Sequence, residues 1–167
     1  AAAARRRLAG LDLACIEQRR VTLDAANELL AGALPASIGV ATGSIALDAE
    51  TAQAYAAAGR PAILVREDTS TADLVGIAAA QGTLTARGGR TAHAAVVARQ
   101  LGKACLVGCT ALRIDSVARR VSFGERRLGE GETITLDCEN GRVLAGEARV
   151  RVEKPTEWLQ ELASWSL

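Results

Sequence analysis

The chain has 167 residues, which is enough for one domain of ordinary size plus extensions. Hydrophobic residues make up 49% of it and aromatic residues only 2%, so a sizeable core built from small and branched aliphatic side chains is expected. The formal net charge of +1 excludes the large basic field that would attract nucleic acid or an anionic membrane. No apolar run reaches the roughly 20 residues of a membrane span, so neither nucleic acid nor a membrane is an expected partner.

The four cysteines are expected to be free structural thiols. None of them forms a Cys-x-x-Cys pair and the chain has a single histidine, so no metal site is expected. Cys105 and Cys109 lie in an apolar run, which is typical of small buried residues in a reducing compartment. The Ala- and Arg-rich start lacks the apolar core and cleavage site of a secretory signal peptide. The cytoplasm is therefore the expected location.

Residues 1–33 are expected to form a helical segment. Apolar residues over 8–16 have broadly helical spacing, and Thr22 is a candidate N-cap for a second helix that ends at Gly32. The turn between the two helices is expected near residues 19–21.

From Leu34 onward, short apolar runs alternate with glycine-containing turns, a pattern that predicts an α/β domain. Two strands are expected on either side of a turn at Thr42-Gly43, and a helix is expected to begin after Asp48 and to end at Gly59. The next expected elements are strand 61–65, helix 71–80 with Ser70 as its cap and Gly82 as its end, strand 83–85, helix 91–101 ending at Gly102, and strand 104–107.

Beyond residue 107 the pattern is mostly β. Strands are expected over 119–123 and 133–136, and Asn140-Gly141 predicts a hairpin turn that leads into strand 143–145. The pattern changes again at Lys154-Pro155, after which a helix carrying Trp158 and Trp165 is expected. An exposed apolar face on that helix would favour self-association, so a homodimer is one expected assembly.

The only histidine, His93, stands after Arg87-Gly88-Gly89-Arg90-Thr91-Ala92 at the start of an expected helix. The first N–H groups of a helix lack intrahelical partners and the helix dipole is positive there, so a phosphoryl group on His93 would meet free donors. The same field, with Arg87 and Arg90, opposes protonation of the imidazole and leaves a lone pair for attack. Gly88 and Gly89 leave room for a bulky phosphate donor.

The alternative is a capping or surface histidine beside solvated arginines. Residue chemistry alone leaves both interpretations open, because neither a helix N-terminus nor nearby arginines by themselves establish phosphoryl transfer.

The whole run 87–99 closely resembles the phosphohistidine motif of the PEP-utilising enzymes, a family that includes pyruvate, phosphate dikinase, PEP synthase and enzyme I of the sugar phosphotransferase system. The resemblance covers residues 34–150. Further segments that resemble the dikinase branch are 34–37, 63–70, 73–76, 102–105, 113–115 and 130–134.

This resemblance implies an α/β fold with a swivelling β/β/α phosphohistidine domain over residues 34–150, which moves between two distant active sites. Residues 1–33 resemble the end of a preceding nucleotide-binding region, and 151–167 a linker and the start of a following helix. Hinges are expected at 31–37 and 151–156. The implied partners are an ATP-grasp nucleotide-binding domain and a PEP/pyruvate TIM-barrel domain, in cis or in trans. ATP and Mg²⁺ are expected in those domains, and no cofactor is expected on this chain.

The resemblance makes His93 the phosphoryl acceptor, which would carry a tele-phosphohistidine. The local chemistry described above makes Arg87, Gly88, Gly89, Arg90 and Thr91 the expected supporting residues. Thr91 matches the threonine that a regulatory kinase/phosphorylase modifies in some dikinases. The chain is expected not to turn over pyruvate alone.

Two positions depart from the dikinase pattern. Arg90 replaces the usual Met and Ala92 replaces the usual Ser, which blurs the choice of subfamily. A domain of PEP synthase or of another PEP-utilising phosphotransferase therefore stays open as an alternative, as does a non-catalytic regulatory remnant.

Overall fold

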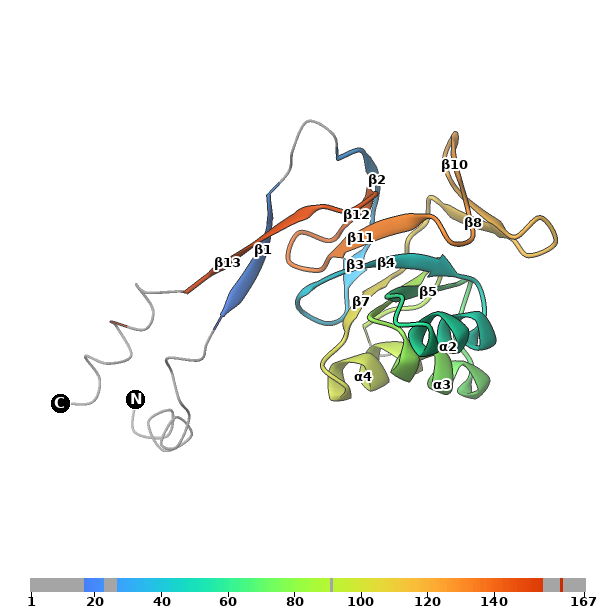
Figure 1. Ribbon diagram of the computed structural model, residues 1–167, viewed down its shortest axis with the longest axis horizontal. Coiled ribbons are helices and arrows are strands. Elements are labelled where there is room, and N and C mark those ends of the chain that lie inside the picture. Colours follow the sequence, from blue (N-terminus) through green and yellow to red (C-terminus); the bar gives the residue numbers. More distant parts are fainter. Residues whose placement is uncertain (1–16, 23–26, 91, 155–159, 161–167) are drawn as a thin grey trace.

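Three strand–helix–strand crossovers build the centre of the molecule, for which the computed structural model describes residues 17–22, 27–90, 92–154 and 160 (Figure 1). Their strands run parallel to one another and are the short apolar runs of the sequence, as expected for strands covered on both faces. These strands are β4 (Val40–Ala46), β5 (Ala62–Arg66), β6 (Gly82–Thr85) and β7 (Ala104–Val107).

Helices make the connections between these strands. Asp48 is the N-cap of the first helix, because its side chain accepts a hydrogen bond from the Thr51 N–H at 2.7 Å. Ser70 and Asp73 form a capping box before the second. The helical elements are α2 (Ala49–Ala57), the 3₁₀ turn η2 (Thr71–Asp73), α3 (Leu74–Ala79) and α4 (His93–Gln100).

Antiparallel strands extend this parallel centre on both sides into an eight-stranded sheet of order β2-β12-β11-β4-β5-β6-β7-β3. The β11–β12 pair is the hairpin that Asn140-Gly141 predicts. The added strands are β2 (Leu29–Gly32), β3 (Leu34–Pro35), β11 (Thr133–Asp137) and β12 (Arg142–Ala145).

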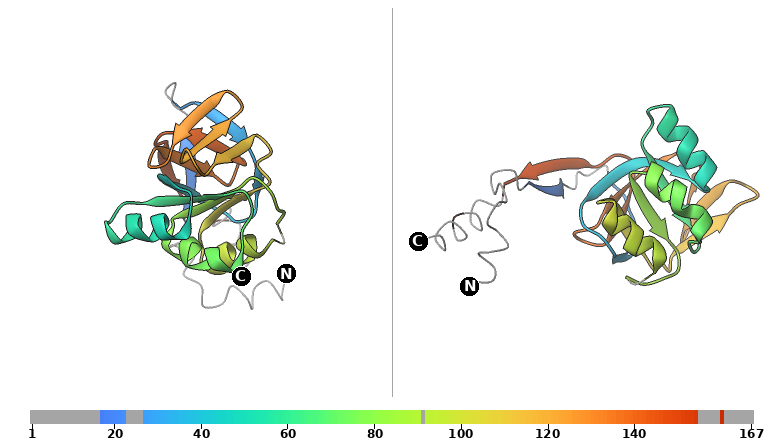
Figure 2. Two further views of the ribbon diagram at one scale, coloured as in Figure 1. Left: turned by 90° about the vertical axis from the view of Figure 1, so that its right-hand side faces the viewer. Right: turned by 90° about the horizontal axis from the view of Figure 1, so that it is seen from below.

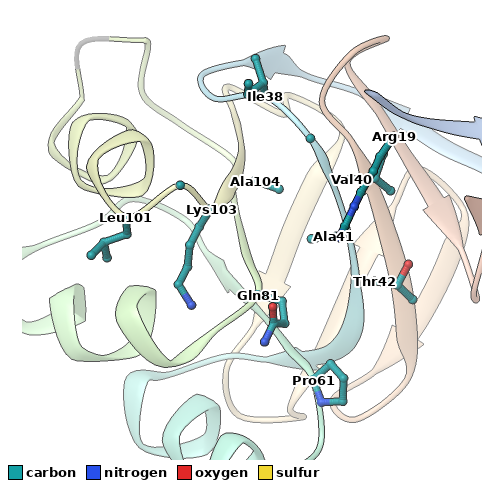
Figure 3. Close-up of a pocket in the computed structure, with 12 residues that line it drawn as sticks. Arg19, Ile38, Val40, Ala41, Thr42, Pro61, Gln81, Leu101, Lys103 and Ala104 are labelled. Carbon is teal, nitrogen blue, oxygen red and sulfur yellow. The ribbon is translucent and has the colours of Figure 1, made fainter. Parts of the chain in front are cut away.

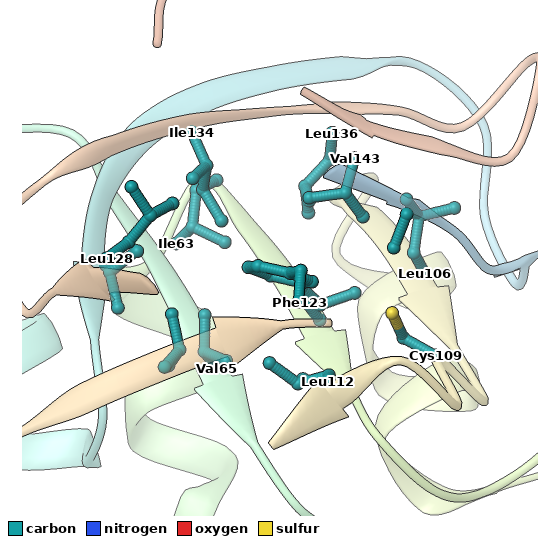
Figure 4. Packing of buried hydrophobic residues seen from close by; sticks show 14 of the residues in the cluster. Ile63, Val65, Leu106, Cys109, Leu112, Phe123, Leu128, Ile134, Leu136 and Val143 are labelled. Atoms are coloured by element: carbon teal, nitrogen blue, oxygen red, sulfur yellow. The ribbon is translucent and has the colours of Figure 1, made fainter. Parts of the chain in front are cut away.

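A second, three-stranded sheet of order β10-β9-β8 covers the face of the large sheet that the helices leave free (Figure 2). Its strands are β8 (Leu112–Asp115), β9 (Arg120–Phe123) and β10 (Arg126–Gly129). Phe123, Leu112 and Leu128 point into the core between the two sheets (Figure 4). A separate, alanine-rich core lies between the large sheet and the helices. The molecule thus has three layers: sheet, sheet and helices.

A two-stranded antiparallel ribbon, β1 (Gln18–Thr22) with β13 (Arg149–Glu153), projects from these layers (Figure 1). Most of its side chains are exposed or half-buried.

The helical segment expected over residues 1–33 is wrong in its described part, where β1 and β2 are strands. The partners of these strands, β13 and β12, come more than a hundred residues later in the chain. Strand pairing with distant segments therefore determines the structure here, and the local helical spacing of apolar residues does not reveal it. Residues 1–16 and 23–26 lie outside the described residues, as does most of the helix expected around Trp158 and Trp165. Residues 151–153, expected as linker and hinge, belong to β13.

The turn expected at Thr42-Gly43 is also wrong, because β4 passes straight through both residues. Thr42 pairs with Thr135, and their hydroxyl oxygens lie 2.9 Å apart. A Cβ at Gly43 would lie 2.9 Å from the carbonyl carbon of Pro61. Gly43 therefore permits a close approach of two chain segments and does not mark a turn.

Candidate functional site

His93 is the first residue of α4 and its side chain is exposed. The loop that carries it, residues 86–92, leaves the carboxyl end of β6. In sheets of parallel strands, ligands bind outside the carboxyl ends of the strands. The loops that follow β5 and β7 run to the same edge, so the fold presents His93 where such sites form.

The start of α4 leaves backbone donors available. Ala92, the N-cap, has φ −58° and ψ 150° and no side chain caps it in the described structure. The Val96 N–H makes the helix's first bond, to the Ala92 carbonyl at 3.1 Å. The N–H groups of the first turn are therefore not used by the helix itself, which is the arrangement that favours an anion.

Several hydrogen bonds fix the loop. The buried Thr85 hydroxyl donates to the Arg87 carbonyl at 2.6 Å, and the Ala92 N–H donates to the Gly89 carbonyl at 2.9 Å. The Arg99 guanidinium donates from Nη1 to the carbonyls of Arg90 at 3.0 Å and Ala36 at 3.1 Å. Arg99 thereby ties the loop to the segment after β3.

Arg99 is a positioning residue that sequence reasoning missed. It stands six residues after His93 within the motif-like run, but its two acceptors lie 9 and 63 residues away. Nothing in the local sequence distinguishes it from an ordinary cation in the last turn of a helix.

The two glycines before His93 differ in what they do. Gly88 has φ +95°, a conformation that side chains disfavour, and a Cβ there would lie 3.3 Å from the Ala92 Cβ. The Gly88 carbonyl also lies 3.1 Å from the Cβ position of Gly108, in the loop after β7. A Cβ at Gly89 would meet nothing within 4 Å. Gly88 is therefore needed for the shape of the loop, whereas Gly89 only keeps space open.

The arginines of the loop place less positive charge near His93 than the sequence suggests. Arg87 pairs with Glu67, which follows β5, at 2.9 Å, and both side chains are largely exposed. This pairing weakens the positive field that the sequence assigns to Arg87. Arg90 is exposed. Thr91 lies outside the described residues.

The described cysteines are buried in the core. Burial raises the pKa of the Cys105 thiol to about 11 and that of Cys138 to about 12, and it also raises the pKa of Cys109. These thiols therefore stay protonated at neutral pH, as structural cysteines do. Cys15 lies outside the described residues.

A groove of about 700 Å³ lies at the other end of α4, between Lys103, Gln81, Pro61 and Arg19 (Figure 3). Burial lowers the pKa of Lys103, whose Nζ donates to the Ala80 carbonyl at 2.5 Å. An eight-residue helix is roughly 12 Å long. None of the residues that line the groove belongs to the His93 loop, so this groove is not part of the candidate site.

Comparison with known proteins agrees with the motif. Residues 58–141, which include the whole loop and α4, match the family described as "PEP-utilising enzyme, mobile domain". Pyruvate, phosphate dikinase 1, chloroplastic, of Arabidopsis thaliana is 40% identical over 140 residues, which are 84% of this chain. The dikinase 1, chloroplastic, of Zea mays is 45% identical over 121 residues, or 72% of this chain.

The chain is much shorter than these relatives. It spans 14% of the length of the Arabidopsis thaliana protein and 13% of that of Zea mays. The similarity therefore concerns a part of each relative that is about as long as one domain. In the described part of the chain, no helix is long and apolar enough to cross a membrane, and no group of three His, Cys, Asp or Glu side chains is placed to hold a metal.

Proposed function

Because the chain belongs to the family of PEP-utilising enzyme mobile domains, we propose that it is the phosphocarrier domain of a pyruvate, phosphate dikinase-like transferase. It carries a phosphoryl group on His93 between an ATP site and a pyruvate/PEP site. The observation that supports this most is the exposed position of His93 at the first turn of α4, on the edge where parallel strands end.

The proposed chemistry is two in-line transfers at one ring nitrogen. The Nε2 lone pair of neutral His93 attacks the donor phosphorus, a P–N bond forms, and the bond to the donor's leaving oxygen breaks with its electrons on that oxygen. In the second transfer the enolate oxygen of pyruvate attacks the same phosphorus. The P–N bond breaks and its electron pair returns to the imidazole. Such transfers depend on positioning and charge stabilisation.

The residues around His93 supply positioning and part of the charge stabilisation. First-turn N–H groups of α4 face the negative charge of the phosphoryl oxygens, and Arg87 and Arg90 add positive charge at the loop. Arg99 and Gly88 hold the loop that sets the direction of the imidazole. Thr91 is the proposed site of regulatory phosphorylation, since a second phosphate there would repel the group that His93 carries.

The proposal places the remaining chemistry in partner domains. An ATP-grasp domain, with ATP and Mg²⁺, supplies the phosphoryl group, and a TIM-barrel domain binds pyruvate or PEP, in cis or in trans. The domain swivels between them. We propose a cytoplasmic location; several relatives bear the word chloroplastic in their names. The sequence alternatives of a synthase domain and a non-catalytic remnant are less favoured, since the relatives reported above are dikinases.

Labelling of His93 tests the proposal. The full-length gene product, incubated with PEP carrying a labelled phosphate, is expected to incorporate acid-labile, base-stable label at His93, and His93→Ala is expected to incorporate none. Gln100→Ala, an exposed change at the other end of α4, is the matched control and keeps the label. Label that persists in His93→Ala would contradict the proposal.

A further inference from the structure

The groove of about 700 Å³ at the far end of α4 lies between the β1–β13 ribbon and the layers (Figure 3). Pro61, Gln81 and Lys103, which line it, directly precede the parallel strands β5, β6 and β7. Arg19, which also lines it, belongs to β1 of the ribbon. We call it the amino-edge groove, because it lies where the parallel strands begin. Its volume is in the range of pockets that hold small molecules.

Small residues keep this groove open and give it apolar walls. A Cβ on Gly82 would lie 3.0 Å from the Ala41 Cβ and 3.2 Å from the Ala104 carbonyl oxygen, so three strands converge closely here. Ala41 and Ala104 themselves line the groove. Two further apolar lining residues, Ile38 and Leu101, are 86% and 47% exposed. The apolar body of a ligand would therefore find contacts in the groove.

The charge of the amino-edge groove is positive. Arg19 and Lys103 line it, and no aspartate or glutamate is among the described residues that do. In the part of the chain that the structure describes, Arg19 makes no ion pair, whereas the neighbouring Arg20 lies 3.9 Å from Glu139 and from Glu153. Both cations of the groove are therefore available to an anion.

Lys103 is a half-buried cation without a counter-charge. Its Nζ donates to the Ala80 carbonyl at the end of α3, at 2.5 Å, which uses one of the three N–H bonds of the ammonium. Burial lowers the pKa of Lys103, and no carboxylate among the described residues offsets that effect. An unpaired arginine on a surface is common, but a half-buried ammonium has lost hydration that a bound anion would replace. Lys103 therefore favours an anion more than Arg19 alone does.

From this arrangement we propose that the amino-edge groove binds a small dicarboxylate, with one carboxylate at Lys103, the other at Arg19 and the apolar body between them. The two cations lie on opposite sides of Ala41 and Ala104 (Figure 3). One cation at each end matches the single charge of a carboxylate, and the planar guanidinium of Arg19 can bind a carboxylate with two parallel hydrogen bonds. A phosphate would need several converging donors at one place.

A ligand held by both cations would join the ribbon to the layers, because Arg19 belongs to β1 and Lys103 directly precedes β7. It would favour the arrangement in which both contacts exist, by the difference between its affinities for that arrangement and for one with the ribbon opened. A bound dicarboxylate would thus restrain the swivelling that would carry His93 between its partners. Only this last consequence rests on the proposed function.

Glutarate, whose two carboxylates are joined by a short alkyl chain, is the probe for the site. When it is titrated into the isotope-labelled 167-residue chain, the NMR signals of the Gln81, Lys103 and Ala104 amides are expected to shift and saturate. Valerate has the same number of carbons but one carboxylate, and is expected to bind at least about tenfold more weakly. Absence of shifts at these amides, or equal binding of valerate or inorganic phosphate, would overturn the proposal.

A matched pair of variants on one strand controls for general loss of charge. Arg19→Gln is expected to weaken glutarate binding about tenfold, and Arg20→Gln, which removes the same charge from a residue with carboxylates beside it, is expected to leave it unchanged. Lys103→Met keeps the apolar part of the side chain and is also expected to weaken binding about tenfold. If Lys103→Met does not fold, the arginine pair decides. Equal effects of Arg19→Gln and Arg20→Gln would contradict the site.

Hydrogen exchange tests the coupling to the ribbon. Saturating glutarate is expected to slow exchange of the Arg20 and Val152 amides at least about tenfold in the unmodified chain, and to have no such effect in Arg19→Gln. Binding without slower exchange would refute the coupling and leave the site. None of these measurements involves labelling of His93, so they hold whether or not the proposed function does.

Discussion

Gly88 and Gly89 are neighbouring glycines of one loop, and replacement by alanine is expected to destabilise the protein at Gly88 but hardly at Gly89. Gly88→Ala is expected to cost about 1–2 kcal/mol of unfolding free energy, because its φ of +95° disfavours a side chain. The new Cβ would also lie 3.3 Å from that of Ala92. Gly89→Ala, with no neighbour within 4 Å, is expected to cost less than about 0.5 kcal/mol. Urea unfolding of both variants measures the difference.

Function should divide the two glycines differently. Under the proposed function, Gly89→Ala is expected to slow labelling of His93 although it leaves the stability almost unchanged. The reason is that Gly89, on the open side of the loop, leaves room for the phosphate donor. If the two variants lose equal stability, the backbone conformation at Gly88 is not what requires glycine there.

The role of Arg99 in holding the His93 loop could not be predicted from the sequence. Its charge and position are those of any cation near a helix end, and only the fold brings the Arg90 and Ala36 carbonyls to its guanidinium. The place of His93 at the start of a helix, in contrast, was predictable from the local pattern, whereas its role as phosphoryl acceptor stays a prediction.

At the scale of elements, Arg119 couples the small sheet to helix α2. It lies in the turn between β8 and β9 with φ +51°, unusual for a residue with a side chain. Its guanidinium donates to Asp48 Oδ2 and Glu130 Oε2, both at 2.7 Å, and to the Thr51 hydroxyl at 3.0 Å. The cap of α2 and the turn of the small sheet are thereby one charged cluster.

This cluster predicts an acid-sensitive contribution from Asp48. Burial alone would raise the pKa of its carboxyl, but the Thr51 N–H and the Arg119 guanidinium outweigh burial and lower the pKa below 3.8. A carboxyl with a lowered pKa stabilises the folded state at neutral pH, and the stabilisation is lost as the pH falls through the folded-state pKa. Asp48→Asn keeps a capping oxygen and removes the charge.

We therefore expect wild type to exceed Asp48→Asn in thermal stability by a constant amount above about pH 5, and the gap to close as the pH falls below about 4. Melting temperatures between pH 7 and pH 2.5 measure it. Arg119→Gln is expected to narrow the gap at neutral pH. A gap that persists unchanged at pH 2.5 would show that the charge of Asp48 is not the cause.

Elements whose signals are local were predictable. The hairpin at Asn140-Gly141 forms because Gly141 adopts φ +63°, and the buried Asp137 carboxylate accepts hydrogen bonds from Asn140 and Arg142 within the same hairpin. The cap at Asp48 is equally local. Strand β5 was predictable because its side chains are almost all buried, so it reads as an unbroken apolar run.

Strands that depend on distant pairing partners could not be predicted from the sequence. β3 has two residues and exists only because it pairs with β7. β8 (Leu-Arg-Ile-Asp) and β10 (Arg-Arg-Leu-Gly) have four residues each, which is too short for a strand signal to stand out from a loop. Their pairing with β9 builds the three-stranded sheet, so this layer of the molecule could not be located from sequence.

At the scale of the whole molecule, the segment 31–37, expected as a hinge for the swivelling of the domain, is held in place by hydrogen bonds. The Ala33 N–H donates to the Gly141 carbonyl at 2.9 Å, and the Ala36 N–H donates to the Cys105 carbonyl at 2.9 Å. Arg99 holds the Ala36 carbonyl as well. This segment is bonded into the sheet. The β1–β13 ribbon, through which both ends of the described chain leave the layers, is the better candidate for the hinge (Figure 1).

Hydrogen exchange tests that assignment. A two-stranded ribbon with few buried side chains is marginally stable, so its hydrogen bonds should open without unfolding the layers. Amides of Arg20 and Val152 are expected to exchange at least about a hundredfold faster than those of β5 and β11. The β11–β12 hairpin is the internal control, since it is antiparallel like the ribbon but buried in the core. Ribbon amides as protected as those of β11 would mean that the ribbon is rigid, and a swivelling domain would then need its hinge elsewhere.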